Sequence, residues 1–150
     1  VAEVAAAEMP ALVEHLRVTG RLTPVFLMHA LCTGRAEFFV AAIANLSGQE
    51  ERRVRSLLSN GREAAVRALY ETTGLGADVS ALFAEATMLW RREAKGGDGL
   101  HSVSEMLLAR SRAMGNAACQ AMLELVERLA IAEQRQTARS YALIATREAA

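Results

Sequence analysis

The sequence predicts an all-α fold, and three observations lead to that prediction. Alanine and leucine, which lose little free energy in a helix, supply 30 and 19 of the 150 residues. Apolar residues recur at intervals of three and four positions, which is the period of one helix face. Glycine, proline and capping residues divide the first hundred residues into segments of short-helix length. A chain of this size can bury one core, so we expect a single helical domain over residues 1–150.

The first two helices have clear start and stop signals. Pro10 can open the first helix, which should end before Gly20. Thr23 and Pro24 fit the N-cap and the first residue of the second helix, because proline lacks the amide hydrogen that this position leaves unbonded. The second helix should then run to Gly34.

Four further short helices follow. The third should end near Gly48, where Ser47 and Glu50 also match a capping box. The fourth follows directly, the fifth is expected over about 62–73, and the sixth begins near Asp78. The short-helix region therefore extends over about residues 10–95.

A glycine-rich connection at 96–99 separates these short helices from one or two longer helices over about 102–149, with Gly115 as the candidate break. Met106, Met114 and Met122 recur every eight residues in the longer region. Such a stripe is either core or an adaptable groove for a helical partner, which could be a second copy of the chain.

The arrangement of the short helices has two alternatives. Residues 31–43 and 58–70 form a degenerate repeat, in which Leu31 and Gly34 correspond to Leu58 and Gly61. Stacked antiparallel helix pairs of this length build an α-solenoid. A compact bundle of glycine-terminated helices would produce a similar pattern, so the sequence leaves solenoid and bundle open.

Composition restricts the function classes. Seventeen basic residues balance seventeen acidic ones, so no overall field attracts nucleic acid or an anionic membrane, and any such binding depends on a local patch. Cys32 and Cys119 lie in apolar stretches, as expected for buried free thiols in a cytoplasmic protein. No apolar run approaches the length of a membrane span. The start at Val1 suggests a fragment of a longer chain.

The segment at about 41–58 has the spacing of a helix-turn-helix. Ala44, Gly48 and Val54 provide the small residue, the turn glycine and the β-branched residue that let two helices meet closely. Any tight corner between two helices needs similar residues, so a purely structural corner is the alternative.

Three arginines make this segment the candidate interaction surface. Arg52, Arg53 and Arg55 lie within one turn of the helix that would enter the major groove, where they could contact phosphates or guanine edges. They suit an acidic protein surface equally well. Glu50 and Glu51 at the helix start oppose the DNA interpretation, because they would face the phosphate backbone.

We assign no catalytic residue, cofactor or metal ligand. His29 and Cys32 lie three apart on one predicted helix and His15 precedes them, a spacing that zinc can use. His29 lies in an apolar stretch, however, and no second motif supports a metal site. The glycines at 96–99 follow a helix rather than a strand, so they predict a connection and not a phosphate loop.

Six short segments, in order along the chain, resemble the bacterial domain-of-unknown-function family 2336. They are LVEHL at 12–16, GRLTP at 20–24, ALC at 30–32, EFF at 37–39, LSG at 46–48 and RALY at 67–70. The resemblance covers about residues 12–90 and implies an all-helical cytoplasmic protein. It implies no activity, substrate or cofactor and brings no catalytic residues.

Taken together, these features predict a non-enzymatic protein-interaction module with a scaffold or regulatory role. The alternative is a DNA-binding regulator that uses the helix-turn-helix-like segment at about 41–58. Under the first hypothesis the partner is another protein or a second copy of the chain, and neither hypothesis involves a membrane.

Overall fold

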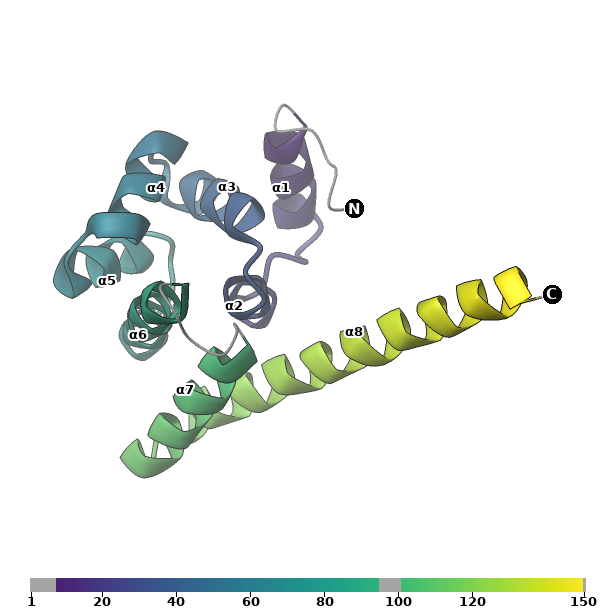
Figure 1. The fold of residues 1–150 in the computed structure, drawn as a ribbon. Coiled ribbons are helices and arrows are strands. Elements are labelled where there is room, and N and C mark those ends of the chain that lie inside the picture. The colour runs from purple at the N-terminus through teal and green to yellow at the C-terminus, as the bar shows by residue number, and fades with distance from the viewer. Residues whose placement is uncertain (1–7, 95–100, 150) are drawn as a thin grey trace.

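The computed structural model describes residues 8–94 and 101–149, and every regular element within these ranges is a helix (Figure 1). The all-α prediction is therefore confirmed. The glycine-rich connection predicted at 96–99 lies outside the described residues. The helices are α1 (Met9–Val18), α2 (Pro24–Cys32), α3 (Ala36–Ser47), α4 (Glu51–Asn60), α5 (Glu63–Glu71), α6 (Ala77–Ala94), α7 (His101–Met114) and α8 (Ala117–Ala149).

Local signals explain where the early helices begin. The Thr23 hydroxyl accepts a hydrogen bond from the Phe26 amide at 3.2 Å, and Pro24 is the first residue of α2, as predicted. The predicted capping box of Ser47 and Glu50 is wrong. Ser47 is the last residue of α3, and its hydroxyl accepts from the Gln49 amide at 3.3 Å instead. Glu50 is itself the N-cap of α4 and makes no side-chain capping bond.

Helix α2 lies at the centre of the fold. Every residue from Leu27 to Cys32 is buried, as expected for a helix that is apolar on all sides. It packs against its neighbour α3 and also against α6, α7 and α8, which are far from it in the sequence. In a solenoid each repeat would contact only its neighbours. The short helices therefore close into a compact bundle, and a cluster of Phe39, Tyr70 and Phe83 fills its interior.

The two copies of the degenerate repeat agree in which residues are buried, but their turns differ. Leu31 and Leu58 are both buried at equivalent positions. Gly34 between α2 and α3 has a φ of 76°, in the left-handed region. Its counterpart Gly61 between α4 and α5 has a φ of −65° and an extended backbone. The two helix pairs thus share an apolar pattern, but the backbone that connects their two helices has a different conformation in each pair.

The longer C-terminal region consists of two helices that reverse direction at Gly115, whose φ is 71°. The Asn116 side chain accepts from the Cys119 amide at 3.1 Å and so caps the start of α8. Because the chain turns back here, the three methionines do not form one continuous stripe. Met122 is part of the core, whereas Met114 at the turn is 76% exposed.

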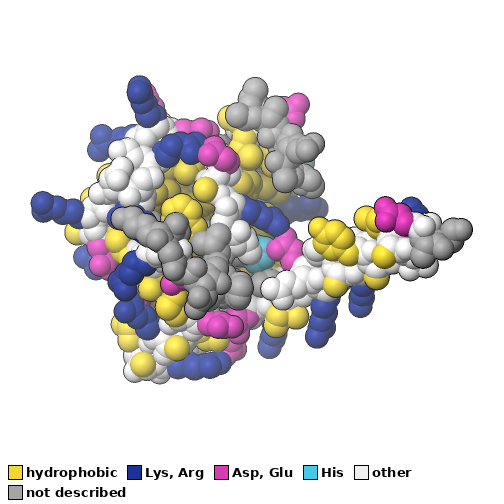
Figure 2. All heavy atoms as spheres, in the orientation of Figure 1, with side chains coloured by type: hydrophobic (Ala, Val, Ile, Leu, Met, Phe, Trp, Pro, Cys, Tyr) yellow, Lys and Arg dark blue, Asp and Glu magenta, His cyan; other side chains and the backbone are white. Residues whose placement is uncertain are grey.

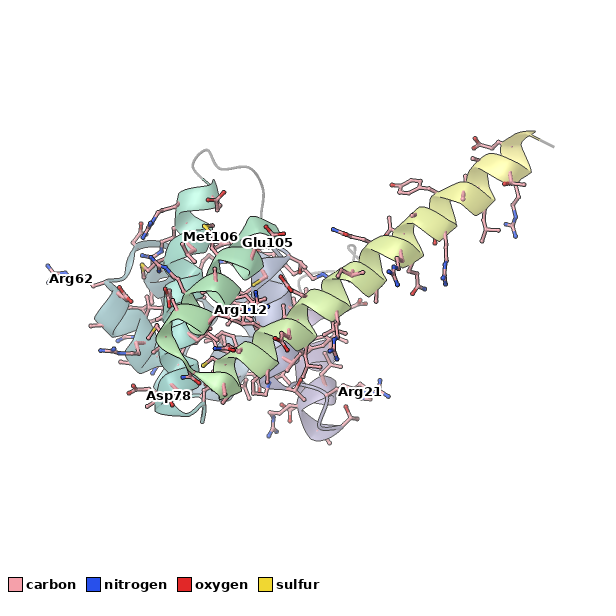
Figure 3. All side chains as sticks on the ribbon, turned by 90° about the horizontal axis from the view of Figure 1, so that it is seen from below. Arg21, Arg62, Asp78, Glu105, Met106 and Arg112 are labelled. Carbon is pink, nitrogen blue, oxygen red and sulfur yellow. The ribbon has the colours of Figure 1, made fainter. Side chains whose placement is uncertain are left out.

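Helix α8 is much longer than the bundle on which it begins. Its 33 residues correspond to a length of roughly 50 Å. The first half packs against α2 and α7, and the second half projects past the other helices in both viewing directions (Figures 1 and 3). None of the helices in the described residues is apolar over a stretch long enough to cross a membrane.

Candidate interaction surfaces

The α3–α4 corner has the geometry that its sequence pattern predicts. Ala44 and Val54 are both buried and bring the two helices into contact. Gly48 ends α3 with a φ of 72°, a conformation that glycine adopts without the strain imposed by a Cβ atom. Three residues separate the two helices. The corner is therefore tight, as both the structural and the DNA-binding interpretations require.

The three candidate arginines on α4 do not behave alike. The Arg55 guanidinium donates two hydrogen bonds to the Glu37 carboxylate of α3, at 2.8 and 2.9 Å. Arg52 and Arg53 are exposed and line a shallow surface depression together with Glu50, Ser56 and Leu57. The sequence thus located the cations correctly, but it missed that Arg55 already has a carboxylate partner within the fold.

Acidic side chains reduce the positive field of this corner. The hydrogen bonds from Arg55 lower the pKa of Glu37, so that carboxylate stays ionised and offsets the charge of Arg55 at neutral pH. Glu50 and Glu51 are exposed at the N-terminal end of α4, the end that a recognition helix directs at base edges. Only Arg52 and Arg53 then remain to neutralise phosphates, which suits a small acidic protein surface better than a DNA backbone.

The three residues considered as zinc ligands lie in different environments. His15 is exposed on α1, whereas Cys32 is buried on α2, where burial raises the pKa of its thiol to about 12 and keeps it protonated. His29 is buried and faces Glu133 of α8, with 3.2 Å between Nε2 and the nearest carboxylate oxygen. Within residues 8–94 and 101–149, no group of three or more potential metal ligands comes together.

The most extended candidate surface lies on α8. Residues on one face of this helix, most of them three or four positions apart, follow each other along most of its length. We call this face the α8 stripe, and its members are Cys119, Met122, Leu123, Val126, Glu133, Thr137, Tyr141 and Ile144. The first four are buried in the bundle, whereas Tyr141 and Ile144 are 70% and 53% exposed. The same apolar face that fixes α8 to the bundle thus continues into solvent.

Glu133 marks the point where α8 leaves the bundle. Its carboxylate pairs with the Arg35 guanidinium and lies beside His29, so it connects α8 to α2 and to the residue that precedes α3. Burial is the largest effect on His29 and lowers its pKa, although the nearby Glu133 carboxylate acts in the opposite direction. His29 is therefore neutral at pH 7.

The opposite face of α8 is basic. Arg128, Arg135 and Arg139 are exposed and spaced seven and four residues apart, which places them on one side of the helix. Figure 2 shows basic side chains along the lower edge of the projecting part and apolar ones along its upper edge. The distal half of α8 is thus amphipathic, with its apolar face in line with the buried face of the proximal half.

In the sequence, the apolar positions of α8 follow each other at helical spacing only as far as Leu129. The polar residues Glu133 and Thr137 interrupt the apolar pattern, and this hid its continuation to Tyr141 and Ile144. Helical spacing alone contained the missing signal, since each of these residues lies three or four positions from the previous one.

A family model matches most of the chain. The sequence model of a family described as an uncharacterised protein conserved in bacteria (DUF2336) matches residues 1–124. The chain belongs to this family. The match confirms the resemblance found over about 12–90 and extends it in both directions. Comparison with curated proteins and comparison with solved structures each found no match.

The DUF2336 match ends inside α8, just before Val126. It therefore includes the α3–α4 corner, the bundle and the first buried turns of α8. The ion-pair site at Glu133 and the exposed part of the α8 stripe lie beyond it. The family description gives no activity, so the function has to be argued from these surfaces.

Proposed function

We propose that this DUF2336 domain is a non-enzymatic protein-interaction module of the bacterial cytoplasm, with a scaffold or regulatory role, and that its partner packs on the distal part of the α8 stripe. The observation that supports this is the continuation of one buried face into solvent at Tyr141 and Ile144. A helix face with a sustained apolar pattern normally packs against another element.

A second copy of the chain is the partner that fits this surface best. The distal stripe residues Thr137, Tyr141 and Ile144 carry no charge, and the flanking residues Ala138 and Ala145 are small. In an antiparallel pair of α8 helices related by a two-fold axis at Tyr141, Ala138 lies opposite Ile144 and Thr137 lies opposite Ala145. Ile144 then meets a small side chain and Tyr141 meets its own copy, so two identical uncharged surfaces come together.

The basic face of α8 is compatible with such a pair. Arg135 and Arg139 point away from the stripe and stay solvated when the apolar faces meet. The association therefore needs no buried unpaired charge, which would oppose it strongly. The bundle itself does not change in this arrangement.

The test is the mass of the purified chain in solution, measured by light scattering over a range of concentrations. We expect a dimer whose mass falls to that of the monomer when Tyr141→Glu and Ile144→Glu are combined. The matched control combines Arg135→Glu and Arg139→Glu, which introduces acidic residues on the opposite face and should leave the dimer intact. A wild-type monomer at every concentration, or equal loss in both variants, would reject pairing through the stripe.

The α3–α4 corner supports a second candidate function, duplex DNA binding. The observation in its favour is the left-handed Gly48 between buried Ala44 and Val54, the geometry of a helix-turn-helix. With Arg52 and Arg53 as the solvent-directed cations, binding should be weak and its salt slope about 2 in logarithmic units, because each phosphate contact contributes about 0.9.

Fluorescence anisotropy with a labelled duplex at low and moderate salt tests this candidate. Arg52→Ala combined with Arg53→Ala should abolish binding while the helical content stays constant. Arg62→Ala combined with Arg67→Ala is the matched control, since Arg62 at the N-cap of α5 and Arg67 on α5 are both exposed. Affinity that is absent in the wild type, or equal in the two double variants, would eliminate DNA binding through α4.

A further inference from the structure

The bundle contains a partly enclosed cavity that neither candidate function uses. Its volume is about 190 Å³, and residues of α2, α3, α4 and α6 line it. Small residues leave this space, because Ala30, Gly34 and Ala36 line it around the turn from α2 to α3, where larger side chains would fill it. An engineered apolar cavity of about 150 Å³ in another protein binds benzene, so this space is large enough for about six carbon atoms.

Helix α4 forms one wall of the cavity and is held by polar contacts on two sides. Towards α3, the Arg55 guanidinium pairs with the Glu37 carboxylate. Towards α6, the Arg91 guanidinium donates to three carbonyl oxygens at the C-terminal end of α4, which the helix itself leaves unbonded. They belong to Leu58, Leu57 and Gly61, at 2.6, 2.7 and 2.8 Å. Collapse of the cavity would move α4 and break these contacts, so the space is part of the folded state.

The interior of the cavity is apolar. The Thr87 hydroxyl reaches it, but this group donates to the Phe83 carbonyl at 2.8 Å and also bonds the Tyr70 hydroxyl at 2.6 Å. The interior therefore favours the apolar part of a ligand. Its buried apolar walls include Leu31, Phe39, Val40 and Leu58.

The open side of the cavity is polar. Ser59 and Arg55 of α4 both line the space and are both exposed, so they mark its mouth. The Ser59 hydroxyl can donate and accept a hydrogen bond there. Arg55 is paired with Glu37, so the pair has no net charge, and a second carboxylate at the mouth would meet the like charge of Glu37. The mouth therefore favours a neutral polar group.

From these features we propose that the cavity binds a small neutral alcohol, with a chain or ring of about six carbon atoms in the interior and its hydroxyl group hydrogen-bonded to Ser59 at the mouth. The apolar walls favour the hydrocarbon part, and a hydroxyl group complements Ser59 because each can donate and accept. Ligands with polar groups along their length are excluded, because the interior would leave those groups unpaired. This site does not depend on the association proposed for α8.

A series of straight-chain primary alcohols, from propanol to decanol, measures the depth of the cavity. While each added methylene group enters the apolar interior, affinity should rise about 4-fold, the equivalent of removing one methylene group from water. The rise should end near hexanol, where the space is full. The only tryptophan of the chain is Trp90, which lines the cavity, so its fluorescence reports binding to the intact protein.

Three variants locate the two parts of the ligand. Ala36→Leu narrows the space at a half-buried lining position, so the rise in affinity should end at a shorter alcohol. Ser59→Ala should weaken hexanol roughly 2-fold, the lower end of one net hydrogen bond, because the mouth is exposed. Tyr141→Glu combined with Ile144→Glu removes the exposed apolar surface of α8 and should leave alcohol binding unchanged.

Hexanoate tests the preference for a neutral group. It has the same chain length as hexanol, and it should bind less tightly because Glu37 already occupies the Arg55 guanidinium. Hexanoate that binds as tightly as hexanol, or equal hexanol affinity in Ser59→Ala, would overturn the assignment of the hydroxyl group to the mouth.

Three further outcomes would overturn binding in the cavity. They are no saturable change of the Trp90 signal, an affinity that continues to rise from hexanol to decanol, and loss of binding in the α8 double variant, which would place the alcohol on the α8 stripe. An unchanged series in a folded Ala36→Leu chain would overturn it as well. Should Ala36→Leu fail to fold, the end of the rise in the wild-type chain still decides whether the site has a fixed depth.

Discussion

The proximal and distal halves of α8 belong to one continuous helix with one apolar face, yet they have opposite relations to the rest of the molecule. Up to Val126 that face is buried against the bundle, and beyond Glu133 it is open to solvent at Tyr141 and Ile144. Helical spacing places the apolar residues of both halves on this face, although Glu133 and Thr137 interrupt them in the distal half. Periodicity therefore shows which face of a helix is made for packing, and it does not show which element packs there.

The largest expected effect is a loss of stability that occurs in the proximal half of α8 and not in the distal half. Leu123→Ala in the proximal half removes a fully buried side chain and should lower the free energy of unfolding by about 2–5 kcal/mol. Tyr141→Ala in the distal half removes an exposed one and should change it by no more than about 0.5 kcal/mol. Urea unfolding below the concentration at which any dimer forms measures both.

A substantial loss of stability for Tyr141→Ala in the monomer would show that the distal half packs against its own chain. That result would also remove the exposed surface on which the proposed association depends. Ile144→Ala is an internal repeat of the same measurement, because it truncates the other exposed apolar side chain of the distal stripe.

A smaller effect is expected at the boundary between the halves. Glu133→Gln keeps the size of the side chain and removes the charge that pairs with Arg35. Because this pair is partly exposed, the loss should lie within about 0–1 kcal/mol. Hydrogen exchange of the amides around residue 133 should accelerate while amides near Leu123 remain protected. Equal acceleration at both places would mean that the two halves open as one unit.

The same comparison explains which features of the fold could be predicted from the sequence. Helix class, the Pro24 start, the Gly48 stop and the Gly115 break were predictable, because each rests on the conformation of one or two local residues. The choice of a bundle over a solenoid was not, since it depends on contacts between α2 and α8, which are far apart in the chain.

The candidate sites show the same limit. The sequence located the arginines of α4 correctly, but the Arg55–Glu37 pair joins different helices and left no local trace. The cavity beside Trp90 depends on how well four helices fill the space between them, and sequence patterns carry no measure of packing. Met114 and Met122 were misplaced on one stripe because the reversal at Gly115 lies between them.

The smallest expected effect concerns pH and also arises at the boundary between the halves. Burial lowers the pKa of His29 in the folded chain, whereas in the unfolded chain it lies near the ordinary value of about 6.5. As pH falls from 7.5 to 5.5, the unfolded state therefore binds protons that the folded state does not, and the free energy of unfolding decreases. Glu14 and Glu37 have lowered pKa values and contribute only at more acidic pH, below this window.

Thermal or urea unfolding at several pH values tests this, with His29→Gln expected to flatten the dependence and His15→Gln, at an exposed position on α1, expected to retain it. Glu133→Gln should make it steeper, because the Glu133 carboxylate raises the pKa of His29 and its loss widens the difference between the folded and unfolded states. A shallower pH dependence of stability in Glu133→Gln would mean that the carboxylate does not act on His29. The distal half of α8 would then leave the bundle nearer to Val126 than the ion-pair site indicates.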